Sequence, residues 1–394
     1  MKAESKKMTK RKVYLDYAAT TPVDPAVLKA MLPYFNKDFG NPSSMHSFGL
    51  KSAQALQDSR QVIAKAIDAK NEEIVFTSSA TESANLALKG AAFANKTKGN
   101  HIIISAIEHD CVLNTASWLK KQGFTVTSVP VDKYGVVNPK DIEKSVKKET
   151  ILVSVMWANN EIGTIEPVEE IGEICRKRNI LFHSDAAQVF GKIPIDVSKL
   201  NIDLLTVSSH KIYGPVGSAL LYIKQGTLIE PILHGGGQER NLRSSTENLP
   251  AIIGFAKAAE MAMERLKSEN AKLAKLRDKL IAKVLRNIDD SYLNGHSIKR
   301  LSNNVNLRFS YIEGESLMME LDAYGIAVST GSACSSPKLE PSHVLLALRL
   351  RPEEIHGSIR ISLGRWTTDE EIDYLLEILP KVVKKLRKIS PFAN

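Results

Sequence analysis

Short apolar, β-branched runs alternate with helix-length segments over roughly 200 residues of this chain. The predicted strands cover residues 73–77, 101–105, 125–130, 151–156, 180–183, 204–207 and 219–223. Predicted helices lie between them at 84–93, 112–122 and 167–178. Because this alternation builds a sheet with helices on both faces, we predict an α/β fold with a mostly parallel sheet flanked by helices.

Polar residues follow several of these strands directly. Glu108 and His109 come after one strand, residues 158–161 after another, and residues 184–188 after a third. Lys211 follows the strand at 204–207, and ligands of open α/β sheets bind at the carboxyl ends of their strands. A lysine partly stripped of water can form a Schiff base, although a solvated lysine at a strand end is the simpler interpretation.

The segment 78–83, SSATES, leads from a strand into a helix. Free backbone N–H groups at a helix start favour an anion, so the segment is a candidate phosphate cradle. Serine, threonine and glutamate at this place also form an ordinary capping box. The segment alone therefore does not decide between the two interpretations.

Lys211 and Asp185 together match the needs of pyridoxal phosphate (PLP), which takes an amine for its aldehyde and a carboxylate for its ring nitrogen. His109 is a candidate for stacking on the ring and moving protons. Candidate ring contacts are Asn160 and Gln188, and candidate phosphate ligands are Ala80, Thr81, Ser208 and His210.

The pattern changes after residues 234–240. A long helix is predicted from about 252 to 286, then a strand at 303–309, a helix at 314–323 and a last helix that begins at Thr368. The leucine stripe of the long helix is interpreted as a packing face, because it covers too few heptads for a coiled coil. We predict a large PLP-binding domain over 17–262, and a smaller α+β domain made of 1–16 and 263–394.

The three cysteines, Cys111, Cys175 and Cys334, are an odd number without CxxC spacing, so neither a disulfide framework nor a closed zinc site is indicated. Cys334 lies among serine and glycine in a predicted loop at about 329–341, as a reactive thiol would.

Without a signal peptide or an apolar run long enough for a membrane, the expected location is the cytoplasm. Much of the net charge of +9 lies at the two termini, which are either solvated or bind an acidic protein or RNA.

The chain resembles the cysteine desulfurases of the IscS/NifS type, which are class V aminotransferase-like, fold-type I PLP enzymes. The resemblance runs from YLDYAATTPVDP (14–25) through GNPSSMH (40–46), ATES (80–83), EH (108–109) and ANNEIGT (158–164). It continues through HSDAAQ (183–188), SSHKIYGP (208–215), HGGGQERNLRSSTEN (234–248), STGSACSSPKLEPSHVL (329–345) and SIRISLGR (358–365).

The resemblance implies a role for each matching position. Lys211 is the Schiff-base lysine, Asp185 pairs with the ring nitrogen, and His109 stacks on the ring as an acid–base group. The other implied PLP contacts are Asn160, Gln188, Ala80, Thr81, Ser208 and His210, with Thr246 reaching in from the second subunit of a homodimer. Arg360 and Asn41 bind the substrate carboxylate, which suits a bidentate guanidinium. The Cys334 thiolate attacks the sulfur of cofactor-bound L-cysteine, alanine leaves, and a persulfide remains on Cys334.

The implied partners are L-cysteine and an acceptor for the sulfur. That acceptor is an iron–sulfur scaffold protein or another sulfur acceptor, including one that serves tRNA thiolation, and Cys334 is a possible transient iron–sulfur ligand. Membrane association and direct nucleic-acid binding are not expected.

The chain departs from the family pattern at Ser79, Asn241 and Ser245, where glycine is usual, and at Val216, where lysine is usual. The extra side chains are expected to alter the backbone near the phosphate.

Two other hypotheses stay open at this point. One is a different reaction on the same scaffold, such as selenocysteine lysis or transamination, and transamination needs no thiol. The other is a non-catalytic homologue that acts as a scaffold or cluster carrier.

Overall fold

The computed structural model describes residues 12–330 and 341–390. Its largest sheet has seven strands in the order β2-β8-β7-β6-β5-β3-β4. The strands are β2 (Ile74–Thr77), β3 (His101–Ser105), β4 (Thr125–Val129), β5 (Thr150–Ser154), β6 (Leu181–Asp185), β7 (Leu204–Ser208) and β8 (Ala219–Ile223). Only β8 runs against its neighbours β2 and β7, whereas all other pairs are parallel. The predicted mostly parallel sheet is confirmed.

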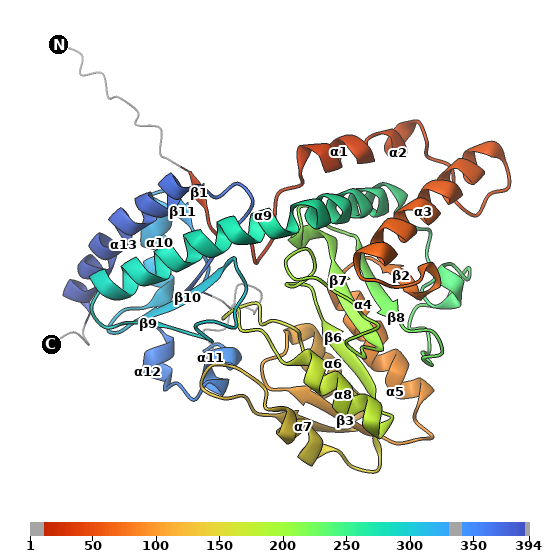
Figure 1. Cartoon of the computed structure of the whole chain (residues 1–394), viewed down its shortest axis with the longest axis horizontal. Helices are drawn as coiled ribbons and strands as arrows, with labels where there is room; N and C mark the ends of the chain where they lie inside the picture. The colour runs from red at the N-terminus through yellow and green to blue at the C-terminus, as the bar shows by residue number, and fades with distance from the viewer. Residues whose placement is uncertain (1–11, 331–340, 391–394) are drawn as a thin grey trace.

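Helices cover both faces of this sheet (Figure 1). Alternate residues of β3 enter different cores, as expected from the period of two in a strand. Ile102 and Ile104 belong to the core that contains residues of α4 (Ala80–Asn85), α5 (Ala91–Ala94) and α6 (Asp110–Lys121). Ile103 belongs to the core that contains residues of α3 (Ser47–Ala66) and α9 (Leu249–Asn287). Five of the strands are buried along their whole length and consist mostly of apolar residues, which explains the short apolar runs in the sequence.

The helices of this part include those predicted at 84–93, 112–122 and 167–178. They are α1 (Pro25–Met31), α2 (Pro33–Asn36), α3 (Ser47–Ala66), α4 (Ala80–Asn85), α5 (Ala91–Ala94), α6 (Asp110–Lys121), α7 (Pro139–Ser145) and α8 (Val168–Arg178). A π-helical turn, Leu86–Gly90, joins α4 to α5. The helix predicted at 84–93 therefore begins four residues earlier, because the Ser79 hydroxyl caps it by accepting from the Glu82 N–H at 3.1 Å.

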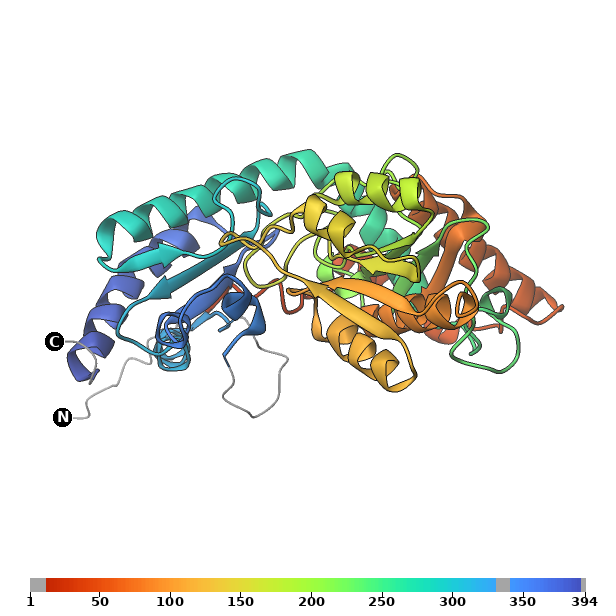
Figure 2. The ribbon, with the colours of Figure 1, turned by 90° about the horizontal axis from the view of Figure 1, so that it is seen from below.

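The long helix α9 (Leu249–Asn287) crosses the whole molecule, and Figure 2 shows it along one side of both parts. Its first half packs into the core of the large sheet. Its second half buries Leu273, Leu276, Leu280 and Val284 in a separate core. The leucine stripe is thus a packing face, as predicted.

The second core lies around an antiparallel sheet of order β12-β10-β9 and a short parallel pair, β1 with β11. The elements are β1 (Val13–Tyr14), β9 (Ser291–Leu293), β10 (Asn304–Phe309), β11 (Ile326–Ala327), β12 (Ser358–Ser362), α10 (Gly314–Ala323), α11 (His343–Ala347), α12 (Pro352–Ile355) and α13 (Asp369–Ile389). Thr368 and Glu371 form the predicted capping box of α13. Val344, Leu345 and Leu348, around α11, pack instead into the core of the large sheet. The domain boundaries at 17–262 and 263–394 stay a prediction.

Among the described residues, we find no helix that combines the length and the apolar character needed to cross a bilayer.

Candidate active site

A cavity of about 520 Å³ lies at the carboxyl ends of the parallel strands. Loops after β2, β3, β5, β6 and β7 each contribute to its wall, and β12 closes it from the second core. Ten of the residues predicted for the site line this cavity: Ala80, Thr81, His109, Asn160, Asp185, Gln188, Ser208, His210, Lys211 and Arg360. The fold thus brings together side chains from positions 80 to 360 of the chain.

Lys211 ends a short 3₁₀ turn, Ser209–Lys211, that follows β7. Its Nζ atom donates to the backbone carbonyls of Ala18 and Ala19, at 2.6 Å each. Gly214 allows the turn to close, because a Cβ atom there would lie 2.1 Å from the Ser209 hydroxyl oxygen. The amine is therefore held by the loop after β1 at the wall of the cavity.

Asp185 is the last residue of β6, and its side chain is buried. Its Oδ1 atom accepts a hydrogen bond from the Ala187 N–H at 2.8 Å. Burial raises the pKa of Asp185, while the Ala187 N–H and the charges of His109 and Lys211 act in the opposite direction. A cationic group in the cavity would stabilise the ionised form of this carboxyl.

His109 caps the N-terminus of α6. The Cys111 N–H donates to Nδ1 of His109 at 3.1 Å, so the proton of a neutral His109 is on Nε2.

The preceding residue, Glu108, is completely buried, and burial raises its pKa to about 8. Its Oε1 atom accepts from the Ser105 hydroxyl at 2.5 Å and from the Met156 N–H at 2.7 Å. The buried Glu108 carboxyl thus ties the residue next to His109 to β3 and to the loop after β5.

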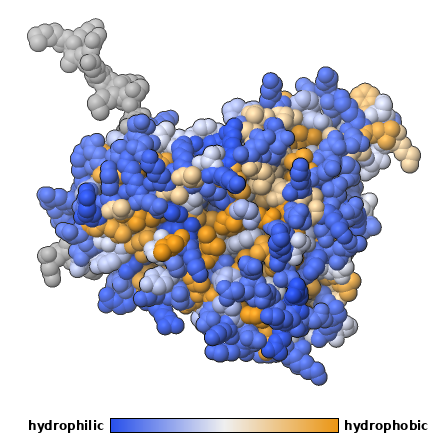
Figure 3. All heavy atoms as spheres, viewed as in Figure 1, coloured by the Kyte–Doolittle hydropathy of each residue, from blue (hydrophilic) through white to orange (hydrophobic). Residues whose placement is uncertain are grey.

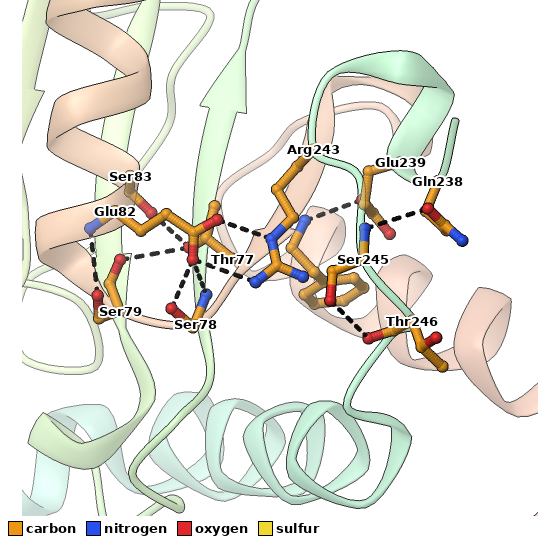
Figure 4. Close-up of polar contacts among 11 residues, drawn as sticks. Thr77, Ser78, Ser79, Glu82, Ser83, Gln238, Glu239, Arg243, Ser245 and Thr246 are labelled. Atoms are coloured by element: carbon orange, nitrogen blue, oxygen red, sulfur yellow. Dashed lines mark hydrogen bonds and ion pairs between the residues drawn. The ribbon is translucent and has the colours of Figure 1, made fainter. Parts of the chain in front are cut away.

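The start of α4 is held by a network of polar contacts (Figure 4). The Glu82 carboxylate accepts from both the N–H and the hydroxyl of Ser78, at 2.8 and 2.5 Å. The same carboxylate is paired with the Arg243 guanidinium at 2.7 Å. Arg243 belongs to the segment that carries Thr246, so this ion pair ties that segment to the first turn of α4.

The departures from the family pattern have different structural consequences. Ser79 has a φ of −163°, extended backbone that any residue adopts, so its side chain causes no strain and caps α4 instead. The expected change of backbone at this position is not found. Asn241 and Ser245 have φ values of 65° and 155°, in the region that favours glycine. Val216 is 73% exposed and lies at the rim of the cavity.

Arg360 comes from β12 and is buried. One terminal nitrogen pairs with Asp16 Oδ1 at 2.9 Å, and the other donates to the Asn160 carbonyl at 3.0 Å. Its Nε atom is buried without a hydrogen-bond partner among the described residues. Because this N–H group has no partner, the Arg360 guanidinium can still bind an anionic group of a small ligand.

Two predicted site residues do not line the cavity, and a third lies outside the described residues. Asn41 lies in an exposed loop between α2 and α3, where its side chain accepts from the Ser43 N–H at 2.8 Å. Thr246 is exposed near the start of α4 and does not line the cavity of its own chain. Cys334 lies outside the described residues, as does most of the predicted loop at 329–341.

Comparison with known proteins gives the family. The aminotransferase class-V model matches residues 13–375. A cysteine desulfurase IscS of Methanosarcina thermophila is 54% identical over 379 residues, which are 96% of this chain and 94% of that protein. Cysteine desulfurase IscS 1 of Archaeoglobus fulgidus is 54% identical over 96% of this chain and 98% of its own. The chain belongs to the cysteine desulfurase family.

Solved structures agree with this membership. A structure described as a NifS-like protein superposes with a TM-score of 0.90 at 40% identity, covering 95% of this chain and all of that one. A structure described as SspA in complex with cysteine has a TM-score of 0.81 at 37% identity and covers 91% of this chain. The predicted family and the predicted fold class are both confirmed.

Several residues around the site of this cysteine desulfurase were not singled out from the sequence. Asp16 pairs with Arg360, and the carbonyls of Ala18 and Ala19 hold Lys211. His343, the first residue of α11, lines the cavity, and its Nε2 lies 3.0 Å from the Glu108 carbonyl. Asp16, Ala18 and Ala19 belong to YLDYAATTP and His343 belongs to LEPSH, so the motifs that indicated the family could have identified them.

Proposed function

We propose that this protein uses PLP to convert L-cysteine to L-alanine and passes the sulfur, as a persulfide on Cys334, to an acceptor protein. One observation carries the proposal: an amine, Lys211, and a buried carboxyl, Asp185, line the same cavity in a chain 54% identical to a cysteine desulfurase.

The cavity residues fit PLP. The Ser218 hydroxyl is buried, lacks a hydrogen-bond partner among the described residues and lines the cavity, so it can serve a ligand. Ala80 and Thr81 begin a helical stretch whose backbone N–H groups suit a phosphate, and Ser208 and His210 add polar side chains nearby. The Asp185 carboxyl suits the ring nitrogen, and Asn160 and Gln188 suit the ring oxygen.

When bound, PLP supplies an electron sink that lowers the cost of removing the proton from Cα of the substrate. Lys211 would hold the cofactor through its amine, and the same amine would take the Cα proton and return it. His109 would stack on the ring and exchange protons through Nε2, which carries the proton of the neutral imidazole because Nδ1 accepts from the Cys111 N–H. Arg360 orients the substrate by its carboxylate.

In this proposal, the thiol of Cys334 accepts the sulfur atom of the substrate. The Cys334 thiolate attacks the sulfur atom of the bound substrate, a sulfur–sulfur bond forms and the carbon–sulfur bond breaks. The electron pair of the broken bond stays with the carbon, which takes a proton and becomes the methyl group of alanine. No external oxidant is required, because the sulfur is transferred without its bonding electrons.

The proposed assembly is a homodimer. The surface around α1, α2 and the start of α3 exposes large apolar side chains, here called the α1–α3 patch: Leu28, Leu32, Phe35, Phe39, Met45, Phe48 and Leu50. Figure 3 shows hydrophobic side chains at this outer end of the molecule. Monomeric proteins rarely leave such patches uncovered, so a second copy of the chain is the proposed cover. Asn41 lies in the loop within the patch, and in the dimer we propose that Thr246 acts in the cavity of the partner chain.

We place the enzyme in the cytoplasm, where thiols stay reduced and a persulfide can be passed on. The proposed acceptor is an iron–sulfur scaffold protein or another sulfur acceptor, including one that serves tRNA thiolation. A transient iron–sulfur contact of Cys334 is part of the same proposal.

The test uses full-length protein reconstituted with PLP. We expect a visible absorption band that disappears in Lys211→Ala, together with equal amounts of alanine and transferred sulfur from L-cysteine. A wild-type protein without a Lys211-dependent band would refute the proposal. Turnover that survives in Cys334→Ser would favour transamination, and turnover on selenocysteine alone would favour a selenocysteine lyase.

A further inference from the structure

A histidine from the last quarter of the chain reaches the main cavity. His343 is half-buried and is the first residue of α11. It lines the cavity together with Lys211, His109 and Arg360. The proposed reaction uses the other three side chains but gives His343 no task.

The backbone around His343 is fixed to the large sheet. The Ser342 hydroxyl caps α11 by accepting from the Leu345 N–H at 3.2 Å, and it donates to the buried Glu161 carboxyl at 2.6 Å. Val344 and Leu345 are buried in the core of the large sheet. Residues on both sides of His343 are thus held, so its imidazole has a defined place in the cavity wall.

One hydrogen bond decides which ring nitrogen of His343 carries the proton. Nε2 lies 3.0 Å from the Glu108 carbonyl oxygen, and a carbonyl can only accept, so Nε2 is the donor. In the neutral imidazole the other nitrogen, Nδ1, then carries a lone pair. Among the described residues, Nδ1 of His343 has no hydrogen-bond partner. The cavity wall therefore contains a ring nitrogen that can accept a hydrogen bond.

The two histidines of the wall offer opposite hydrogen-bonding groups. Nδ1 of His109 accepts from the Cys111 N–H, which leaves Nε2 as its donor. His343 is held by the carbonyl of Glu108, the residue before His109, and has its acceptor nitrogen left over. A ligand in this part of the cavity thus meets one donor and one acceptor.

His343 is also connected to the arginine that we propose for the substrate carboxylate. Arg360 donates to the Asn160 carbonyl at 3.0 Å. The next residue, Glu161, accepts from Ser342, which directly precedes His343. L-cysteine has a single methylene group between Cα and its sulfur atom, so its thiol stays close to Arg360 when its carboxylate is bound there. The thiol and His343 are therefore expected in the same part of the cavity.

The carboxyl groups of the cavity compete with His343 for the thiol proton. Those among the described lining residues are Asp110, Glu161 and Asp185. Glu161 already accepts the Ser342 hydroxyl, and Asp185 suits the ring nitrogen of PLP. Asp110, the first residue of α6, is the remaining competitor, so the test includes it.

We propose that Nδ1 of His343 accepts a hydrogen bond from the thiol of L-cysteine and thereby selects this amino acid over those that lack a thiol. The bond orients the sulfur atom and requires neither proton transfer nor a further reactant. Alanine, the product, leaves this acceptor unpaired, which favours its release. The inference rests on the proposed function and assigns the recognition of the substrate side chain within the same site.

The test compares two ligands that differ only at the sulfur atom. L-2-aminobutyrate has nearly the shape of L-cysteine, with a methyl group in place of the thiol. Full-length, PLP-loaded Cys334→Ser protein, in which L-cysteine is not consumed, is titrated with each ligand, and the change in visible absorption gives two Kd values. Adding His343→Phe should raise the Kd for L-cysteine at least about threefold and leave the Kd for L-2-aminobutyrate unchanged.

Further variants separate the hydrogen bond from a general disturbance of the cavity. His343→Gln keeps an N–H group for the Glu108 carbonyl and an oxygen that can accept from the thiol, so it should retain the preference for L-cysteine. His356→Met, at an exposed histidine that does not line the cavity, should change neither Kd. If thermal melting shows that His343→Phe does not fold, His343→Met takes its place.

Equal changes of both Kd values in His343→Phe would overturn the inference. Loss of the preference in Asp110→Asn, with the preference retained in His343→Phe, would overturn it too. In either case the visible band that depends on Lys211 is still present, so the proposed function would stand. A wild-type protein without that band would overturn the proposed function and this inference together.

Discussion

At the scale of single residues, the site depends on side chains whose partners lie far away in sequence. Lys211 is held by a carbonyl 193 positions earlier, and Arg360 pairs with Asp16 across 344 positions. Residue type and strand-end position were enough to predict the lysine, the aspartate and the histidine. They were not enough to predict Asp16, because it acts through a contact with Arg360 that only the folded chain creates.

Arg360 is expected to bind the substrate carboxylate with its planar fork. Arg360→Lys keeps a charge but loses bidentate geometry, so the KM for L-cysteine should rise about tenfold or more, with a smaller change in kcat. Steady-state kinetics measures this. Arg351→Lys, at a side chain that is 77% exposed, is the control and should change neither constant. A fall in kcat at unchanged KM would contradict the assigned role.

Glu108 is expected to make stability depend on pH. Its pKa is about 8 in the folded protein and near 4.5 when unfolded, so between these values the folded state binds more protons and stability falls as pH rises. Glu108→Gln keeps an acceptor for Ser105 and Met156 but cannot ionise. The free energy of unfolding of this variant, compared with that of the wild type, should therefore increase by at least about 1 kcal/mol from pH 5 to pH 8. Chemical denaturation at several pH values measures the difference, and a constant difference would contradict the expectation.

At the scale of elements, the strands and most helices follow from hydrophobic periodicity. The π-helical turn Leu86–Gly90 does not, because one extra residue within a continuous helix leaves too little periodic signal. The early start of α4 was missed for a related reason: the first turn consists of small and polar residues, and its cap is a hydroxyl at Ser79. Cap chemistry, rather than apolar spacing, decides where this helix begins.

The segment from Gln238 to Thr246 is held to the large sheet by a buried ion pair. Glu239 pairs with Arg60 of α3 through two contacts of 2.7 and 2.8 Å, and also accepts from the Phe76 N–H of β2. Glu239→Gln leaves the buried guanidinium without its counter-charge and should cost about 3–5 kcal/mol of unfolding free energy. Glu260→Gln, at the exposed pair with Lys257, should cost less than about 0.5 kcal/mol. Urea denaturation of both variants tests this, and equal losses would contradict it.

At the scale of the whole molecule, α9 joins two cores, and the cavity lies where residues from both parts meet. The order of elements along the chain was enough to predict the mostly parallel sheet with its flanking helices. The sequence showed less about the assembly, because Asn41 and Thr246 lie on the surface and a single chain does not bring them to the cavity.

The proposed dimer predicts complementation between two defective chains. Thr246→Ala chains and Lys211→Ala chains each form impaired sites alone. In a mixed dimer, the intact Lys211 of one chain meets the intact Thr246 of the other, so up to half of the mixed dimers' sites should bind PLP with wild-type affinity. Fluorescence titration after mixing of the unfolded chains and refolding measures this. If Thr246 served its own chain, mixing would restore nothing.

The central claim is that Lys211 activates the substrate and Cys334 takes its sulfur. PLP-loaded protein is mixed with L-cysteine without an acceptor, alkylated, and examined by mass spectrometry at the Cys334 peptide. We predict one added sulfur atom on Cys334 and one alanine per persulfide formed, and neither product in Lys211→Ala. Alanine formed while Cys334 carries no added sulfur, or a persulfide on Cys111 or Cys175 in its place, would contradict the account.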